Sequence, residues 1–210
     1  MKKNRRSGGC VNILRCVSAM LAIGGLMLSS FASAEILGAA NGRTADLTRL
    51  PDLSLDLHFN TGDDYQNIGL RANYRLSPGI ILFGDISQAE FDPLDGTPIG
   101  FGLFYALDGI FENIDAAAKA SYHLGDFDGV DIDVLALEFL FSGLEPIASN
   151  GLMWYANAGI HRIDADIGGS DTEFGFGGGV VLPVSNGEAF AGIDIIDETL
   201  FGIGYRYFFQ

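Results

Sequence analysis

The feature that most constrains this chain is an alternation of apolar and non-apolar side chains at every second position. It recurs in ten segments from residue 52 onward, separated by Gly, Asp, Asn and Pro residues. Successive side chains of a β-strand point to opposite faces, so the alternation predicts strands, and no long segment has a helical period. The predicted strands are 52–60, 67–76, 80–88, 99–107, 114–124, 131–141, 152–163, 173–184, 188–196 and 200–209.

The two faces of these predicted strands differ in their chemistry. One face carries a run of uncharged, mostly apolar side chains in each of the ten strands, and in the last strand it consists of Phe201, Ile203, Tyr205, Tyr207 and Phe209. The other face carries small and polar residues together with a nearly balanced set of charges. These charges are Asp56, Arg71, Arg75, Asp85, Asp115, Lys119, Glu138, Asp194 and Arg206.

Two architectures can bury such an apolar face. In a soluble β-sandwich the apolar faces pack together and water meets the other face, where long polar side chains would be common. In a transmembrane barrel the apolar face contacts lipid, where a Lys or Arg at mid-depth costs about 2–4 kcal/mol. The uncharged face favours the barrel, and it also disfavours a soluble periplasmic barrel with an inverted interior.

Backbone groups in lipid must all be paired, so the sheet has to close. We therefore predict an all-β fold, a closed antiparallel up-and-down transmembrane β-barrel of about ten strands. Eight strands are the alternative, if "GIDIIDETLFGIGY" belongs to one long bulged strand and another segment is not a strand. The glycines of "FGFGGGVV" continue an alternating strand, and we expect them to make room inside the barrel or to let the sheet curve.

Residues 1–34 are predicted to be a cleavable secretory signal peptide. An apolar core over 17–28 follows a basic region, and the small residues Ala32-Ser33-Ala34 precede Glu35. Cleavage of the signal peptide removes both cysteines, Cys10 and Cys16. It also removes five of the 12 basic residues but none of the 27 acidic ones. Seven basic residues then remain against 27 acidic ones, a formal charge of −20 that disfavours nucleic acid as a partner. Residues 35–51 are predicted to be an irregular lead-in, and residues 52–210 the barrel.

With this signal peptide and the aromatic end "FGIGYRYFFQ", the chain resembles the small bacterial outer-membrane β-barrel family, which includes the transmembrane domain of outer membrane protein A. The resemblance implies a bacterial outer-membrane location and insertion by the barrel-assembly machinery. It also implies contact with outer-membrane lipid and lipopolysaccharide. The chain departs from the family pattern by ending on Gln210 instead of Phe.

The resemblance implies a structural or surface role in the envelope, without catalytic residues or a cofactor, and we expect a monomer. Because the sequence stops at the last strand, we expect no appended peptidoglycan-binding domain. Two alternatives remain open. The chain is a small passive porin if the interior charges line a channel instead of forming ion pairs that fill the barrel. It is a hydrolase or lipid-modifying enzyme if a site lies at the barrel rim.

Three histidines are the candidates for a rim site. His58, His123 and His161 lie on the inward side near the ends of odd-numbered strands, so they could converge near Asp126 and Asp128. Such a cluster could bind zinc or act in catalysis, but no HExxH motif or nucleophile elbow is present. We therefore expect neither a metal nor catalysis, and keep these five residues as candidate ligands.

The acidic stretches "GDFDGVDID" and "DADIGGSD" could bind Ca²⁺ or Mg²⁺, or they could be tight hairpin turns, and we favour the turns. Four aromatic residues fall near strand ends on the apolar face, where they are predicted to lie at the membrane interface. These residues are Trp154, Tyr205, Tyr207 and Phe209.

Overall fold

The computed structural model describes residues 44–91, 93–166, 169–196 and 199–209. The predicted signal peptide and the first part of the lead-in, residues 35–43, lie outside these ranges. Within them, no helix has both the length and the apolar character needed to cross a bilayer.

The described chain is almost entirely β-structure. A short 3₁₀-helix, η1 (Leu47–Arg49), precedes the strands. The strands are β1 (Leu53–Thr61), β2 (Tyr65–Ser77), β3 (Ile80–Phe91), β4 (Leu94–Gly96), β5 (Ile99–Ala106), β6 (Ile114–Phe127), β7 (Val130–Gly143), β8 (Met153–Ala165), β9 (Gly169–Val184), β10 (Gly187–Ile195) and β11 (Thr199–Phe208).

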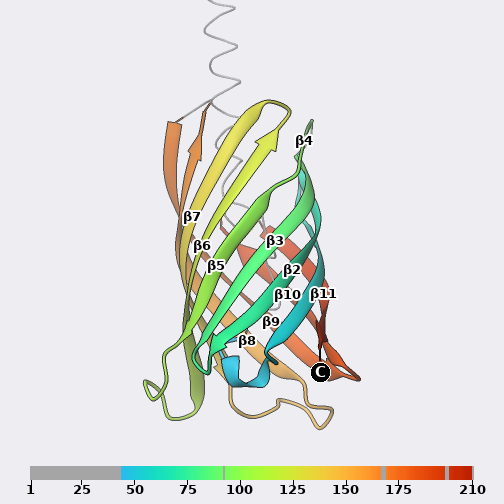
Figure 1. Cartoon of the computed structure of the whole chain (residues 1–210), viewed down its shortest axis with the longest axis vertical. Helices are drawn as coiled ribbons and strands as arrows, with labels where there is room; N and C mark the ends of the chain where they lie inside the picture. Colours follow the sequence, from blue (N-terminus) through green and yellow to red (C-terminus); the bar gives the residue numbers. More distant parts are fainter. Residues whose placement is uncertain (1–43, 92, 167–168, 197–198, 210) are drawn as a thin grey trace, which may run out of the picture. The chain divides into compact units, whose positions relative to one another are not determined.

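The strands form one closed antiparallel barrel (Figure 1). Each long strand pairs with its neighbours in sequence, and β1 pairs with both β2 and β11, so the sheet has no free edge there. The short β4 and the longer β5 share one position between β3 and β6. The barrel therefore has ten strand positions, which confirms the predicted fold, and the eight-strand alternative is wrong.

The tight turns follow from local sequence. Asp128 and Gly129 join β6 to β7 with φ values of 51° and 87°, the left-handed conformation that a two-residue hairpin of Asp-Gly type requires. The Asp126 side chain accepts a hydrogen bond from the Gly129 amide at 2.9 Å. This acidic stretch is thus a structural turn, as the favoured interpretation predicted.

The alternation of side chains separates the two faces of the barrel wall. On the outside, large apolar side chains such as Leu57, Phe139 and Phe176 are 49–58% exposed, whereas alternate residues are buried inside. Consecutive residues of β7 show the contrast, since Leu137 is 45% exposed and Ala136 only 2%. The wall thus has an apolar exterior and a polar, closely filled interior.

Residues 44–51, the described part of the lead-in, fold into one end of the barrel, which the sequence did not predict. We call this the terminal end, because β1 begins and β11 ends there. Ala45, Leu47 and Leu50 are buried in a cluster with side chains from the adjoining strand ends. Those partners are Ile81, Phe83, Phe104, Ala117 and Leu140, with Ala106 and Phe208 packed against them.

Candidate functional site: the charged interior

A row of alternating charges crosses five neighbouring strands inside the barrel. In strand register, Glu188 lies opposite Arg206, Arg206 opposite Asp56, Asp56 opposite Arg71, and Arg71 opposite Asp85. All five side chains are buried. Each charge therefore has an opposite charge on the adjacent strand, the arrangement that buried charges need.

The ion pairs at the centre of this row are close and well oriented. Arg206 donates to the two carboxylate oxygens of Asp56 at 2.7 and 2.9 Å, and to Glu188 at 2.6 Å. Asn73 also donates to Asp56, at 3.1 Å. A bidentate guanidinium–carboxylate pair fixes geometry as well as charge, so the first and last strands are joined by side chains as well as by the backbone.

Arg71 makes the second ion pair of the row. Its Nε and Nη2 donate to one carboxylate oxygen of Asp85, at 3.1 and 2.9 Å. The guanidinium also stacks over the ring of Phe83, 4.4 Å from the centroid. Cation and ring are both buried inside the barrel, Arg71 at 1% and Phe83 at 5% exposed.

A glycine lets the row extend across two more strands, β5 and β6. Gly100 separates Asp85 from His123 in register, and the imidazole reaches across it to the Asp85 carboxylate at 3.2 Å. A Cβ at Gly100 would lie 2.1 Å from the His123 ring and 2.5 Å from Asp85. The absence of a side chain at this position is therefore what allows the contact.

Two further polar contacts lie in the interior. Lys119 donates to Glu138 at 2.5 Å across the β6–β7 pair. Asn157 donates to Asp194 at 3.1 Å across Gly177, whose Cβ would lie 2.0 Å from the aspartate oxygen. Gly177 belongs to the glycine run that was expected to make room inside the barrel.

The remaining predicted interior charges lie near the terminal end. Arg75 donates to the backbone carbonyls of Leu47, at 2.7 Å, and Leu50, so it holds the lead-in. Asp115, close to the start of β6, is partly exposed. Glu188 was not among the predicted interior charges. Its inward parity, which is the same as that of Asp194, was the signal that could have identified it.

The inserted lead-in is also held on its other side. Ser142 of β7 accepts a hydrogen bond from the Ala45 amide at 2.7 Å, and its hydroxyl lies 3.3 Å from that of Thr44. A cavity of about 10 Å³ remains between the lead-in, Phe104 and Arg206. Such a volume is about one water probe, so this part of the lumen is filled.

The three histidines do not form the predicted rim cluster. His58, His123 and His161 are each 1% exposed and lie inside the barrel. His58 contacts Asn67 at 3.1 Å, and His123 contacts Asp85. In the part of the chain that the structure describes, no three His, Cys, Asp or Glu residues are grouped to hold a metal ion. The predicted convergence is therefore wrong.

Asp126 lies instead at the exposed end of β6, and Asp128 in the exposed turn between β6 and β7. A polar hollow of about 520 Å³ adjoins this turn and the β4 strand. Its walls are held by hydrogen bonds between Asp95 and Asp128, each amide donating to the other residue at 3.2 Å. The carboxylates there act as turn-forming groups.

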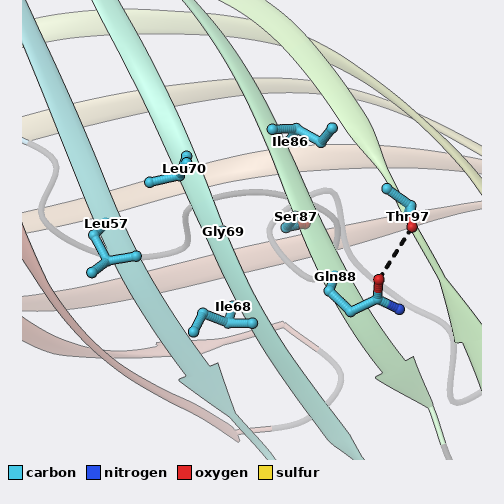
Figure 2. A pocket seen from close by; sticks show the side chains of 8 residues that line it. All are labelled: Leu57, Ile68, Gly69, Leu70, Ile86, Ser87, Gln88 and Thr97. Carbon is cyan, nitrogen blue, oxygen red and sulfur yellow. Dashed lines mark hydrogen bonds between the residues drawn. The ribbon is translucent and has the colours of Figure 1, made fainter.

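Shallow apolar grooves mark the outer wall. Figure 2 shows one of them, where Leu57, Ile68, Leu70 and Ile86 surround the bare backbone at Gly69. At one side of the groove, Thr97 donates to Gln88 at 3.3 Å, so polar groups at this edge are paired. The apolar side chains that line the groove suit contact with a lipid acyl chain. No reactive side chains converge among the residues that line it.

The four predicted interface aromatics all lie toward the terminal end of the barrel. Trp154 is near the start of β8, and Tyr205, Tyr207 and Phe209 are at the end of the chain. Tyr207 and Phe209 are 41% and 44% exposed and stack edge to face with centroids 5.0 Å apart.

No family model and no curated protein matches the sequence. Among solved structures, the chain is similar to a KdgM porin, with 12% identity and a TM-score of 0.42 over 75% of this chain and 99% of that one. It is also similar to LpxR from Salmonella typhimurium, with 10% identity, a TM-score of 0.43, and 80% and 86% coverage. A bacterial polysaccharide outer membrane secretin shares 9% identity and a TM-score of 0.49, over 75% and 64% of the chains. At these values the role of the chain has to be argued from its own geometry.

Proposed function

We propose that this chain is an integral β-barrel of the bacterial outer membrane, with a structural or surface role and a lumen closed by its own side chains. The observation that carries the proposal is the division of the wall into an exterior of large apolar side chains, where exposed charges such as Arg162 and Asp164 lie near the end of β8, and a charged interior. Large apolar side chains such as Leu70 and Phe101 are 43% and 58% exposed, while the neighbouring Arg71 is 1% exposed. Only a hydrocarbon solvent makes this arrangement favourable.

The closed interior supports a structural role over a porin. Ion pairs, the Arg71–Phe83 stack and the inserted lead-in occupy the lumen from the row of charges to the terminal end. A passive channel needs a continuous water path, and barrels of this size are nearly filled by side chains. Outer-membrane lipid, lipopolysaccharide and the assembly machinery are the partners that this role requires, and a sheet that closes on itself needs no second copy.

A non-catalytic role is supported by the burial of the titratable groups. His58, His123 and His161 are enclosed by the wall, where a peptide or lipid substrate does not reach them. Hydrolysis at the rim would need an accessible base beside a nucleophile. If the chain were such an enzyme, the wild type would turn over lipid or peptide substrates in vesicles and His123→Ala would abolish that turnover. We expect the wild type to show no turnover.

Two measurements on the reconstituted protein test the proposal. Electrophoresis with and without boiling should show the compact unheated form of a detergent-resistant closed barrel. Planar-bilayer recording should show no steady conductance for the wild type, whereas Leu47→Asp, which places a charge in the lead-in cluster, should open the terminal end. Steady wild-type conductance at low voltage would favour the porin, and migration independent of heating would contradict the barrel.

A further inference from the structure

Two loops at the terminal end expose large apolar side chains. Residues 107–113 join β5 to β6, and residues 144–152 join β7 to β8; we call them the loop pair. Ile110 and Phe111 of the first are 58% and 49% exposed, and Leu144 and Ile147 of the second are 49% and 57% exposed. Turn segments are usually polar, so a patch of this kind on adjacent loops marks a contact surface.

The first loop leans against the outer wall of the barrel. The ring of Phe111 meets that of Phe141 edge to face, with centroids 6.0 Å apart and an interplanar angle of 67°. Phe141 is on the outward side of β7, since the adjacent Leu140 is buried in the interior. Ala116, opposite Phe141 in register, also faces outward but is 6% exposed, as expected if the loop covers it.

The second loop has a defined conformation. The Ile147 amide donates to the Leu152 carbonyl at 2.8 Å, and the Gly151 amide donates to the Ala148 carbonyl at 3.0 Å. Where this loop leaves β7, the Trp154 ring lies over Gly143, because a Cβ there would be 2.3 Å from the indole nitrogen. The exposed Ile147 is therefore part of an ordered turn beside an interface aromatic.

We infer that the loop pair is a membrane-surface anchor, whose apolar side chains enter the headgroup region of the bilayer that surrounds the barrel. The inference rests on the proposed function. A lipid surface fits better than a protein partner because the patch is continuous with the outer wall through the Phe111–Phe141 contact. Aromatic and branched apolar side chains that leave water for the edge of the acyl-chain region gain free energy in proportion to the apolar area that they bury.

Figure 1 shows both loops at the end of the barrel where the C-terminus is marked. The predicted interface residues Trp154, Tyr207 and Phe209 lie toward the same end. The loop pair would thus widen the aromatic belt on the side formed by β5 to β8, and it would fix the depth of that side in the bilayer.

Fluorescence quenching by brominated lipids tests the anchor. In a Trp154→Phe background, Phe111→Trp and Ile147→Trp each place a single tryptophan in the loop pair, and vesicles carry bromine either near the headgroup or near the acyl terminus. Leu70→Trp reports on the wall, and Asn186→Trp reports on an exposed turn at the same end. Heat-dependent migration verifies that each variant is folded.

We expect headgroup-proximal bromine to quench the two loop tryptophans at least twofold more than terminal bromine does, and to leave Asn186→Trp unquenched. If both loop tryptophans instead behave like Asn186→Trp while Leu70→Trp is quenched, the anchor is wrong and the barrel stands; the patch would then suit a protein partner. If Leu70→Trp is also unquenched, the proposed membrane location itself fails.

Discussion

Arg206 in the last strand donates to both carboxylate oxygens of Asp56 in the first strand, at 2.7 and 2.9 Å, although 150 residues separate them. The two side chains are 4% and 1% exposed. They lie directly opposite each other where β11 meets β1, the pairing that closes the barrel. A strong buried ion pair thus coincides with the seam of the sheet.

Replacing Arg206 should weaken this seam. Arg206→Met keeps much of the volume but removes the guanidinium that pairs with Glu188 and the bidentate donor of Asp56, which retains Arg71 opposite it and the Asn73 hydrogen bond, so we expect a loss of about 3–5 kcal/mol in the free energy of unfolding. Urea unfolding in lipid vesicles, followed by Trp154 fluorescence, measures it. The matched control is Arg162→Met, because the Arg162–Asp164 pair has side chains 59% and 51% exposed and should contribute about 0–1 kcal/mol. Equal small losses for both variants would refute a role for the buried pair.

A single methyl group should disrupt the contact across Gly100. In Gly100→Ala the new Cβ would meet the His123 ring and Asp85 at 2.1 and 2.5 Å, so the overpacking should cost about 1–3 kcal/mol. Gly84→Ala in the adjacent strand is the control, because its nearest neighbour is 3.7 Å away. The melting temperature of the folded band on gels compares them. A Gly100→Ala variant as stable as Gly84→Ala would show that the row ends at Asp85.

The positions of the strands and the inward or outward orientation of their side chains could be predicted from the sequence, because both depend only on the alternation of apolar and polar residues with a period of two. Seven of the nine predicted interior charges are buried, Arg71 and Lys119 among the most deeply, while Arg75 and Asp115 are partly exposed. The register that aligns Glu188, Arg206 and Asp56 was not accessible, since it depends on turn lengths and on the closing pair β1–β11.

The histidines were misplaced because strand ends are the least certain part of such a prediction. The β6 strand continues to Phe127 and β8 to Ala165, beyond the predicted ends at 124 and 163, so the walls rise past His123 and His161. The inserted lead-in was missed for a different reason. Its burial comes from tertiary contacts with Phe83 and Leu140, and a short aperiodic segment carries no local signal of them.

The lead-in should detach when its central apolar contact is removed. Leu47 is 1% exposed, and Leu47→Ala should cost about 2–5 kcal/mol of packing, which raises the open population of the segment by more than about tenfold. Trypsin cleavage after Arg49 in vesicles reports on that opening. Thr48→Ala is the control, because this neighbouring side chain is exposed. Identical cleavage rates would mean that the segment does not close the barrel.

The central claim is that hydrocarbon surrounds the apolar side of the wall, and spin labels on consecutive residues test it most directly. With Cys10 and Cys16 replaced by serine, Leu137→Cys and Ala136→Cys each carry one nitroxide on β7 in vesicles. The account predicts that the label at 137 collides with oxygen but not with a water-soluble nickel complex, and that the label at 136 is immobilised and reached by neither. A label at 137 that the nickel complex relaxes freely, in a protein that remains in solution without detergent or lipid, would contradict it.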